Sequence, residues 1–157
     1  SLLLFLDAEE HGLRGARAFM ADLPVERGQL RLNVNMDMIS RSPANELYAA
    51  GTHPYPRLRP VLEAVGARHD VHLLFGHDQP DHPEQADWTL ASDHAPFHEA
   101  GIPFVYFGVE DHPGYHAPSD TFDRITPDFF VQAAALVLDA LQALDAQLPT
   151  VVPNVTK

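Results

Sequence analysis

Residues 1–23 read Ser-Leu-Leu-Leu-Phe-Leu-Asp-Ala-Glu-Glu-His-Gly-Leu-Arg-Gly-Ala-Arg-Ala-Phe-Met-Ala-Asp-Leu, and the order of side chains in this stretch decides the fold class. The continuous apolar run over 2–6 is typical of a strand that is buried on both faces. Acidic residues within 7–10 end that run. Apolar residues at helical spacing then predict a helix over 12–23, which Pro24 stops. The stretch therefore predicts a strand, an acidic loop and a helix in succession.

Strands and helices alternate along the rest of the chain. Alternating or continuous apolar residues predict further strands over 30–38, 46–50, 71–75 and 102–107. Helical spacing of apolar residues predicts helices over 56–68, 95–100 and 126–148. Residues 76–88 have no periodicity and predict a long loop. This alternation is typical of an α/β fold, so we expect a mixed, largely parallel sheet flanked by helices in an α/β/α sandwich.

The last predicted helix has a clear beginning and end. Thr126 suits the N-cap, and Pro127 suits the first helical position. Its predicted buried stripe consists of Phe130, Ala134, Val137, Leu138, Leu141 and Leu144. Pro149 follows the helix, so we expect one domain over 1–149 and a flexible tail over 150–157.

Composition narrows the classes of partner and of site. The chain of 157 residues has 22 acidic side chains against 10 Lys and Arg, and its formal net charge of -12 argues against nucleic acid or an anionic membrane surface. Its apolar N-terminal run is too short to span a membrane. Cysteine is absent, so disulfides and thiolate sites are excluded, and His, Asp and Glu are the strong metal ligands that the chain offers.

Three of the predicted strands are followed by acidic residues or histidines. Asp7, Glu9 and Glu10 follow the first strand, Asp37 follows the second, and His112 and His116 follow the strand over 102–107. If these strands run parallel, their carboxyl ends meet at one edge of the sheet, where a divalent cation would relieve the repulsion between carboxylates. Zinc suits mixed His and carboxylate ligation, although manganese and cobalt suit it as well. An acidic pair after a strand is, by itself, more often a solvated loop.

Four segments carry a more specific resemblance. Residues 5–16, Phe-Leu-Asp-Ala-Glu-Glu-His-Gly-Leu-Arg-Gly-Ala, resemble the Asp-x-Glu-Glu-x-Gly-Leu-x-Gly-Ser segment of M28 zinc aminopeptidases. Residues 35–39, Asn-Met-Asp-Met-Ile, are similar to the family's Asn-Leu-Asp-Met-Val. Residues 92–103 contain Ser-Asp-His-Ala-Pro-Phe and Gly-Ile-Pro, and residues 115–121 read Tyr-His-Ala-Pro-Ser-Asp-Thr, like the family's Tyr-His-x-x-x-Asp-Thr. All four occur in the family's order, so the chain resembles the C-terminal portion of an M28 catalytic domain.

The resemblance implies roles for individual residues in a site with two zinc ions. Glu9 would be the general base, and Tyr115 would donate to the developing oxyanion. Glu10 and His116 would bind one zinc ion, and Asp37 would bind the other. Residues expected to orient these ligands are Asp93, His94 and Asp120. For Asp93, capping the short helix at 95–100 is an equal alternative.

The resemblance also implies what this chain lacks. In the family, a His-x-Asp segment and the aspartate that bridges the two metals lie upstream of the segment that matches residues 5–16. We therefore expect the fold to be incomplete at its N-terminus, with the N-terminal half of the same protein as a partner. We expect the chain alone to bind zinc partially or not at all and to be inactive. An exposed sheet edge would invite a homodimer.

The function implied is a metal-dependent aminopeptidase that removes N-terminal residues from peptides with a free N-terminus. Two alternatives stay open. One is a non-catalytic binding module with a protease-like fold, and the other is a relative of the glutaminyl cyclases, which use a similar scaffold with one zinc ion. The resemblance favours a secreted or periplasmic location.

Overall fold

The computed structural model describes residues 1–82 and 84–153. Within them lies a four-stranded sheet, formed by β1 (Asn33–Met36), β2 (Glu46–Ala50), β3 (His72–Phe75) and β4 (Phe104–Gly108) in the order β1-β4-β2-β3. β1 runs parallel to β4 and β2 runs parallel to β3, whereas β2 and β4 are antiparallel. The expected mixed sheet is confirmed. Its direction matters for the site, because the carboxyl ends of β1 and β4 share one edge and those of β2 and β3 lie at the other.

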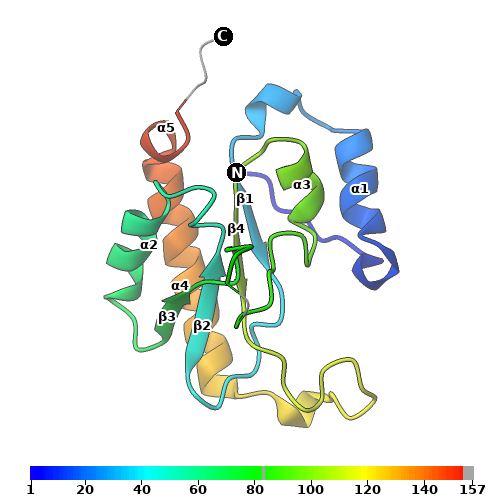
Figure 1. Cartoon of the computed structure of the whole chain (residues 1–157), viewed down its shortest axis with the longest axis vertical. Helices are drawn as coiled ribbons and strands as arrows, with labels where there is room; N and C mark the ends of the chain where they lie inside the picture. Colours follow the sequence, from blue (N-terminus) through cyan, green and yellow to red (C-terminus); the bar gives the residue numbers. More distant parts are fainter. Residues whose placement is uncertain (83, 154–157) are drawn as a thin grey trace.

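Helices cover both faces of this sheet (Figure 1). They are α1 (Arg14–Ala21), α2 (Arg59–Gly66), α3 (Ala95–Glu99), α4 (Pro127–Ala146) and α5 (Leu148–Val151), with short 3-10 turns at η1 (Glu9–His11), η2 (Arg27–Gln29) and η3 (Phe122–Arg124). In Figure 1, α2 and α4 lie on one side of the sheet, and α1 and α3 lie on the other. This arrangement is the three-layer α/β/α sandwich.

The main core lies between the sheet and the α2–α4 layer. Leu47 of β2, Phe107 of β4, Leu62 of α2 and Leu136 of α4 are all fully buried there. Each such side chain contributes roughly 1.5–3 kcal/mol by leaving water. A smaller cluster around Phe97 packs α1 against α3. The fold is therefore held mainly by the α2–α4 side of the sheet.

The apolar run at the N-terminus is not a strand, so that prediction is wrong. Residues 1–8 form no regular structure, and Leu3 and Phe5 are 73% and 89% exposed. Within the run 2–6, only Leu4 and Leu6 are partly buried, against the α1–α3 cluster. A strand needs a neighbouring strand for its main-chain groups, and no strand of the described chain pairs with this segment.

The buried face of α4 differs from the predicted stripe. Val137 and Leu144 are buried as expected, but Phe130 and Leu138 are 41% and 54% exposed. The buried set is Phe129, Ala133, Leu136, Val137, Ala140 and Leu144. Apolar residues surround most of this helix, so spacing alone did not decide which face packs. By length and composition α4 could cross a membrane, and six of its side chains are buried inside the described structure.

The beginning of α4 lies where the sequence predicts it, whereas the chain after α4 is more ordered than expected. Thr126 occupies the N-cap and Pro127 the first turn, although the Thr126 side chain makes no capping hydrogen bond. At the other end, α5 follows directly, and Val151 is buried in the main core. Residues 150 and 151 therefore belong to the folded domain rather than to the expected tail. Residues 154–157 of that tail lie outside the described residues.

Candidate functional site

Two loops leave the sheet side by side at the carboxyl ends of β1 and β4. Met36 pairs with Phe107 in the last register position, and the Asp37 amide donates to the Phe107 carbonyl at 3.1 Å. The chain then continues as the loop 37–45 from β1 and the loop 109–121 from β4. The predicted convergence of these two strand ends is confirmed, even though the segment 2–6 is not a strand.

The 109–121 loop meets the acidic turn η1 through one contact. His116 Nε2 lies 2.9 Å from Glu10 Oε1, and 106 positions separate the two residues in the sequence. Both side chains are more than half exposed. The Tyr115 ring stacks on the His116 imidazole with 3.8 Å between their centroids. The structure thus brings Glu10, His116 and Tyr115 together.

Several residues of these loops have a left-handed backbone. Ala8 and Leu13 flank η1 with φ of 54° and 58°, Met38 follows Asp37 with φ of 54°, and His116 has φ of 53°. This conformation is less stable by roughly 1–2 kcal/mol for a non-glycine residue. Such strain concentrates at sites whose geometry the surrounding structure imposes.

Glu9 and Tyr115 face an acidic environment. Burial raises the pKa of Glu9, and the nearby carboxylates of Asp37, Glu10 and Asp93 raise that pKa further. Burial also raises the pKa of Tyr115, helped by Asp111 and Glu10. A glutamate of raised pKa accepts a proton more readily, and a phenol of raised pKa stays protonated as a donor.

Asp37 is oriented by a chain of hydrogen bonds that begins at a buried histidine. Burial lowers the pKa of His94 to about 4, so its imidazole is neutral at pH 7. Its Nε2–H donates to the Trp88 carbonyl at 2.9 Å, which leaves Nδ1 to accept from Asn35 Nδ2 at 3.4 Å. Asn35 Nδ2 also donates to Ser92 Oγ at 3.1 Å, and Ser92 donates to Asp37 Oδ2 at 2.9 Å.

Sequence reasoning assigned no role to Ser92 or Asn35. Both stand inside the segments that carried the resemblance, one before Asp93 and the other two residues before Asp37. The signal was therefore present, but a hydrogen bond across 55 positions is not visible in a local pattern.

Of the other residues expected to orient the metal ligands, Asp93 lies near Asp37 and Asp120 lies near His112. Burial and the Asp37 carboxylate raise the pKa of Asp93, whose Oδ1 is buried without a hydrogen-bond partner in the described structure. The N-cap of α3 is His94 and lacks a side-chain cap, so the alternative role of Asp93 as that cap is wrong. Asp120 and His112 lie together, with 3.8 Å between Asp120 Oδ2 and His112 Nε2. His112 contacts the loop 37–45 rather than Glu10.

The donor types present suit zinc, while their number is small. An imidazole nitrogen and carboxylate oxygens are ordinary zinc ligands, and a catalytic zinc usually takes about three from the protein. Within residues 1–82 and 84–153, no group of three or more His, Asp or Glu side chains is arranged to hold a metal ion. The buried, unpaired Oδ1 of Asp93 marks a place where a further polar group would fit.

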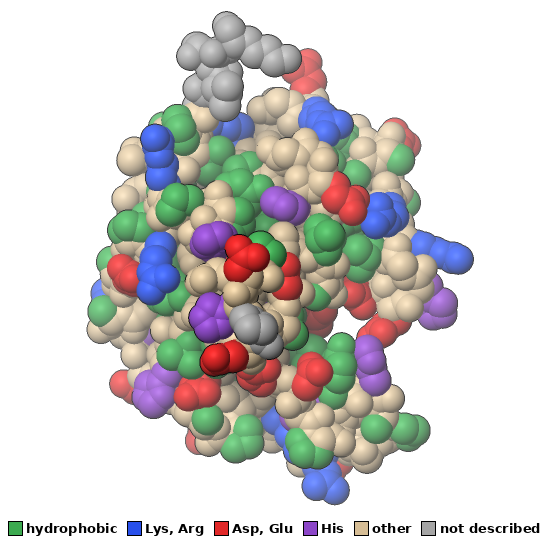
Figure 2. Space-filling view, viewed as in Figure 1, with side chains coloured by type: hydrophobic (Ala, Val, Ile, Leu, Met, Phe, Trp, Pro, Cys, Tyr) green, Lys and Arg blue, Asp and Glu red, His purple; other side chains and the backbone are tan. Residues whose placement is uncertain are grey.

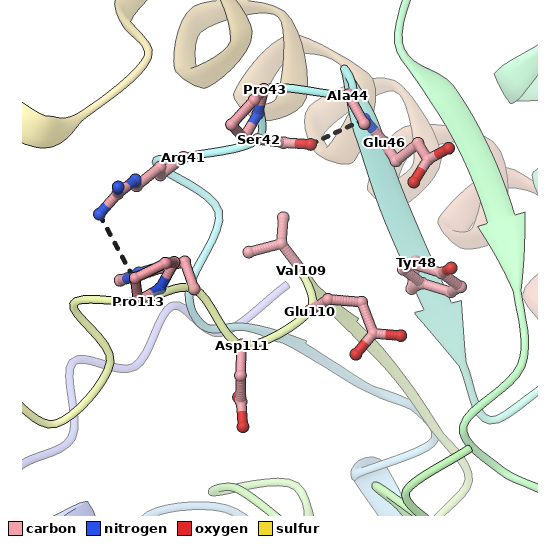
Figure 3. A pocket seen from close by; sticks show the side chains of 11 residues that line it. Arg41, Ser42, Pro43, Ala44, Glu46, Tyr48, Val109, Glu110, Asp111 and Pro113 are labelled. Carbon is pink, nitrogen blue, oxygen red and sulfur yellow. Dashed lines mark hydrogen bonds between the residues drawn. The ribbon is translucent and has the colours of Figure 1, made fainter. Parts of the chain in front are cut away.

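A cavity of about 230 Å³ lies between the two loops (Figure 3). The charged side chains around it are those of Arg41, Glu46, Glu110 and Asp111. Tyr48 and Val109 add apolar wall. On the molecular surface in Figure 2, red and purple side chains lie on either side of a notch at the right-hand edge. The site edge of the sheet is thus open, acidic and rich in histidine.

Comparison with known proteins places this site in a family. The model of "Peptidase family M28" matches residues 2–141. Aminopeptidase YwaD of Bacillus subtilis is 30% identical over 148 residues, which cover 85% of this chain and 30% of that protein. Two solved structures agree in fold. An aminopeptidase from Aneurinibacillus sp. strain AM-1 has a TM-score of 0.68 at 26% identity and covers 87% of this chain and 31% of its own.

The second structure is BSAP, a zinc aminopeptidase from Bacillus subtilis, with a TM-score of 0.67 at 28% identity over 90% of this chain and 34% of that one. This chain therefore spans about a third of the length of these relatives. With a family model that matches almost the whole chain and with the fold of known aminopeptidases, this protein belongs to peptidase family M28.

Proposed function

We propose that this chain is the part of a zinc aminopeptidase that carries the general base and a share of the metal ligands. The observation that carries the proposal is the contact between Glu10 and His116, which lie 2.9 Å apart beside Glu9 and Asp37. The family match and the relatives named as aminopeptidases support peptides as the substrate class. The proposal includes the expectation that the complete site holds two zinc ions.

In this proposal each residue has a definite task. Glu10 and His116 would hold one zinc ion and Asp37 would hold the other, with its carboxylate oriented by Ser92. When bound, zinc would supply a water of lowered pKa and would polarise the scissile carbonyl. Glu9 accepts the proton of the attacking water and delivers it to the leaving amine. The protonated Tyr115 hydroxyl donates to the oxygen on which negative charge develops.

The acidic surroundings also suit the substrate. A peptide with a free N-terminus carries an ammonium group at the residue to be removed. Carboxylates at this edge, such as Asp111 and Glu110, attract that group and disfavour substrates with a blocked N-terminus.

The test compares two proteins side by side: this chain alone and the full-length gene product. Zinc content is measured by mass spectrometry, and hydrolysis is measured with leucine 4-nitroanilide. The matched control substrate is the N-acetylated anilide. We expect about two zinc ions per molecule and hydrolysis of the free-amine substrate in the full-length product, and neither in the chain alone.

Other outcomes have clear meanings. Micromolar zinc binding with turnover by this chain alone would contradict the proposed division of the metal ligands. Equal hydrolysis of the acetylated substrate would contradict an aminopeptidase. Inactivity of the zinc-loaded full-length product would favour a binding module with a peptidase fold.

A further inference from the structure

The loop 109–121 has little regular structure of its own to hold it in place. It carries Tyr115 and His116, yet no helix or strand lies within it. Its contact with η1 joins two side chains that are more than half exposed, His116 and Glu10. An exposed contact of this kind contributes little to stability, because water competes for both side chains. A second attachment is needed to hold the Tyr115 hydroxyl and the His116 imidazole in one position.

Arg41 supplies that attachment from the neighbouring loop. It stands four residues after Asp37, and its side chain is 21% exposed. Its Nη1 lies 3.4 Å from His112 Nδ1 and 4.0 Å from Asp120 Oδ1. Figure 3 shows the guanidinium extended from the loop after β1 toward the loop after β4. One side chain therefore links the loop that carries Asp37 with the loop that carries His116.

The hydrogen bonds of His112 fix the orientation of its ring. The Gly114 amide donates to His112 Nδ1 at 3.2 Å, and Arg41 approaches the same nitrogen. Both groups are donors and share the single lone pair of Nδ1, so the imidazole proton is on Nε2, which faces Asp120 Oδ2 at 3.8 Å. The His112 side chain is only 13% exposed. The ring is thus held at Nδ1 by the backbone and the guanidinium, and the Asp120 carboxylate lies near Nε2 beyond hydrogen-bond distance.

Gly114 shows how closely this arrangement is packed. It is buried, and a Cβ atom added to it would lie 3.3 Å from Arg41 Nη1. The backbone of the loop therefore approaches the guanidinium more closely than most side chains allow. Gly114 is followed directly by Tyr115, so the contact holds the chain one residue before the first residue of the site.

We infer that Arg41, His112 and Asp120 form a brace that positions Tyr115 and His116 for the reaction. The inference rests on the proposed function, in which those two residues act on the substrate or hold zinc. Arg41 and His112 are positioning residues, since neither reaches Glu10. The brace requires His112 Nδ1 to accept a hydrogen bond, and substitutions can test this requirement. An Asn side chain offers an acceptor oxygen in its place, whereas a Phe side chain offers none.

The experiment uses the full-length gene product and three variants. His112→Phe removes both ring nitrogens, and His112→Asn keeps an acceptor for the Gly114 amide. The matched control is His69→Phe, which breaks another pair of histidine and aspartate, with 3.0 Å to Asp139, on a different part of the surface. Amide hydrogen exchange of Gly114, Tyr115 and His116 is measured by NMR, together with kcat and KM for the anilide. Long-range NMR of the imidazole nitrogens reports the tautomer of His112.

We expect the wild-type His112 ring to carry its proton on Nε2. In His112→Phe, exchange of the loop amides should rise roughly tenfold, as expected for a lost hydrogen bond. Its kcat should fall about 10- to 100-fold with little change in KM, because misplaced groups act mainly on the transition state. His112→Asn should restore most of both quantities, and His69→Phe should change neither.

Three results would overturn the brace. They are unchanged exchange in His112→Phe, equal loss in His112→Asn and His112→Phe, or faster exchange without any loss of kcat. Exchange and the tautomer are measured without turnover. A wild-type protein that fails to hydrolyse the anilide would therefore count against the proposed function, and the exchange data would still decide whether the loop is braced.

Discussion

Strand β4 and the loop that follows it are held in place by different interactions. Phe107 of β4 is fully buried between the sheet and the α2–α4 layer. Nine residues later, His116 is more than half exposed on a left-handed backbone, and its partners Glu10 and Tyr115 are exposed as well. The core is held by apolar packing, whereas the site is held by a few directed polar contacts. Stability and chemistry should therefore respond to different substitutions.

The largest effect is expected from Glu9→Gln. This variant keeps the shape of the side chain but removes the carboxylate proposed to accept the proton, so kcat of the full-length product should fall about 10²- to 10⁴-fold. Its free energy of unfolding should stay within about 0.5 kcal/mol of wild type, because Glu9 lies on the polar edge rather than in the core. Steady-state kinetics and urea unfolding check the two halves of this prediction. A variant that unfolds easily would show that the site edge also stabilises the fold.

Phe107→Ala is expected to do the reverse. Truncation of this fully buried ring should lower the free energy of unfolding by about 3–5 kcal/mol, through lost burial and the cavity that remains. Phe5→Ala is the matched control, because the Phe5 side chain is 89% exposed. That control should change stability by less than about 0.5 kcal/mol. Chemical denaturation measures the free energy of unfolding of both variants. A similar decrease in the two would mean that the N-terminal run is buried in solution.

The same contrast explains what the sequence could predict of the fold. β2, β3 and β4 lie where their apolar residues predicted them, since each pairs with another strand of the chain. The run 2–6 has the same composition, but apolar side chains show only that a segment can be buried. Whether it becomes a strand depends on a partner elsewhere, which local composition does not contain. The buried face of α4 was predicted incorrectly for a related reason. A helix that is apolar almost all round has no unique apolar stripe to mark the face that packs against the sheet.

For the site, the motifs shared with the family predicted which residues lie close together. Glu10 and His116 were expected to meet, and they do. No role was predicted for Ser92 or Arg41, because each contacts a side chain that is far away in the sequence. A serine or an arginine has no distinctive local pattern when it donates to a side chain far along the sequence.

His94 adds a pH dependence to the stability of the site edge. Burial lowers its folded pKa to about 4, whereas an unfolded histidine has a pKa of 6.5. Above pH 6.5 the ring is neutral in both states and contributes no pH dependence. As the pH falls from 6.5 to 4, the unfolded state binds a proton that the folded state does not, so stability falls by about 3 kcal/mol and then levels off.

Urea unfolding across pH 4–7 measures this loss. In His94→Phe the part of the slope between pH 6.5 and 4 that belongs to His94 should disappear. His53→Phe is the control, because His53 is exposed and its removal should leave the slope unchanged. An identical slope in wild type and His94→Phe would show that the buried ring is not the source.

The smallest effect compares two hydroxyls that each donate to a carboxylate. Ser92 donates to Asp37 at 2.9 Å on the site edge, and Thr52 donates to Asp78 at 3.5 Å after β2. Ser92→Ala should weaken zinc binding of the full-length product about 10-fold, since partners that orient a metal ligand commonly contribute 10- to 100-fold or so to affinity. Thr52→Val should leave zinc affinity unchanged and lower stability by about 1 kcal/mol or less. Zinc titration against a competing chelator measures the zinc affinity of both variants. Equal affinities would mean that Asp37 keeps its orientation without Ser92. The hydrogen-bond chain from His94 would then contribute to packing alone.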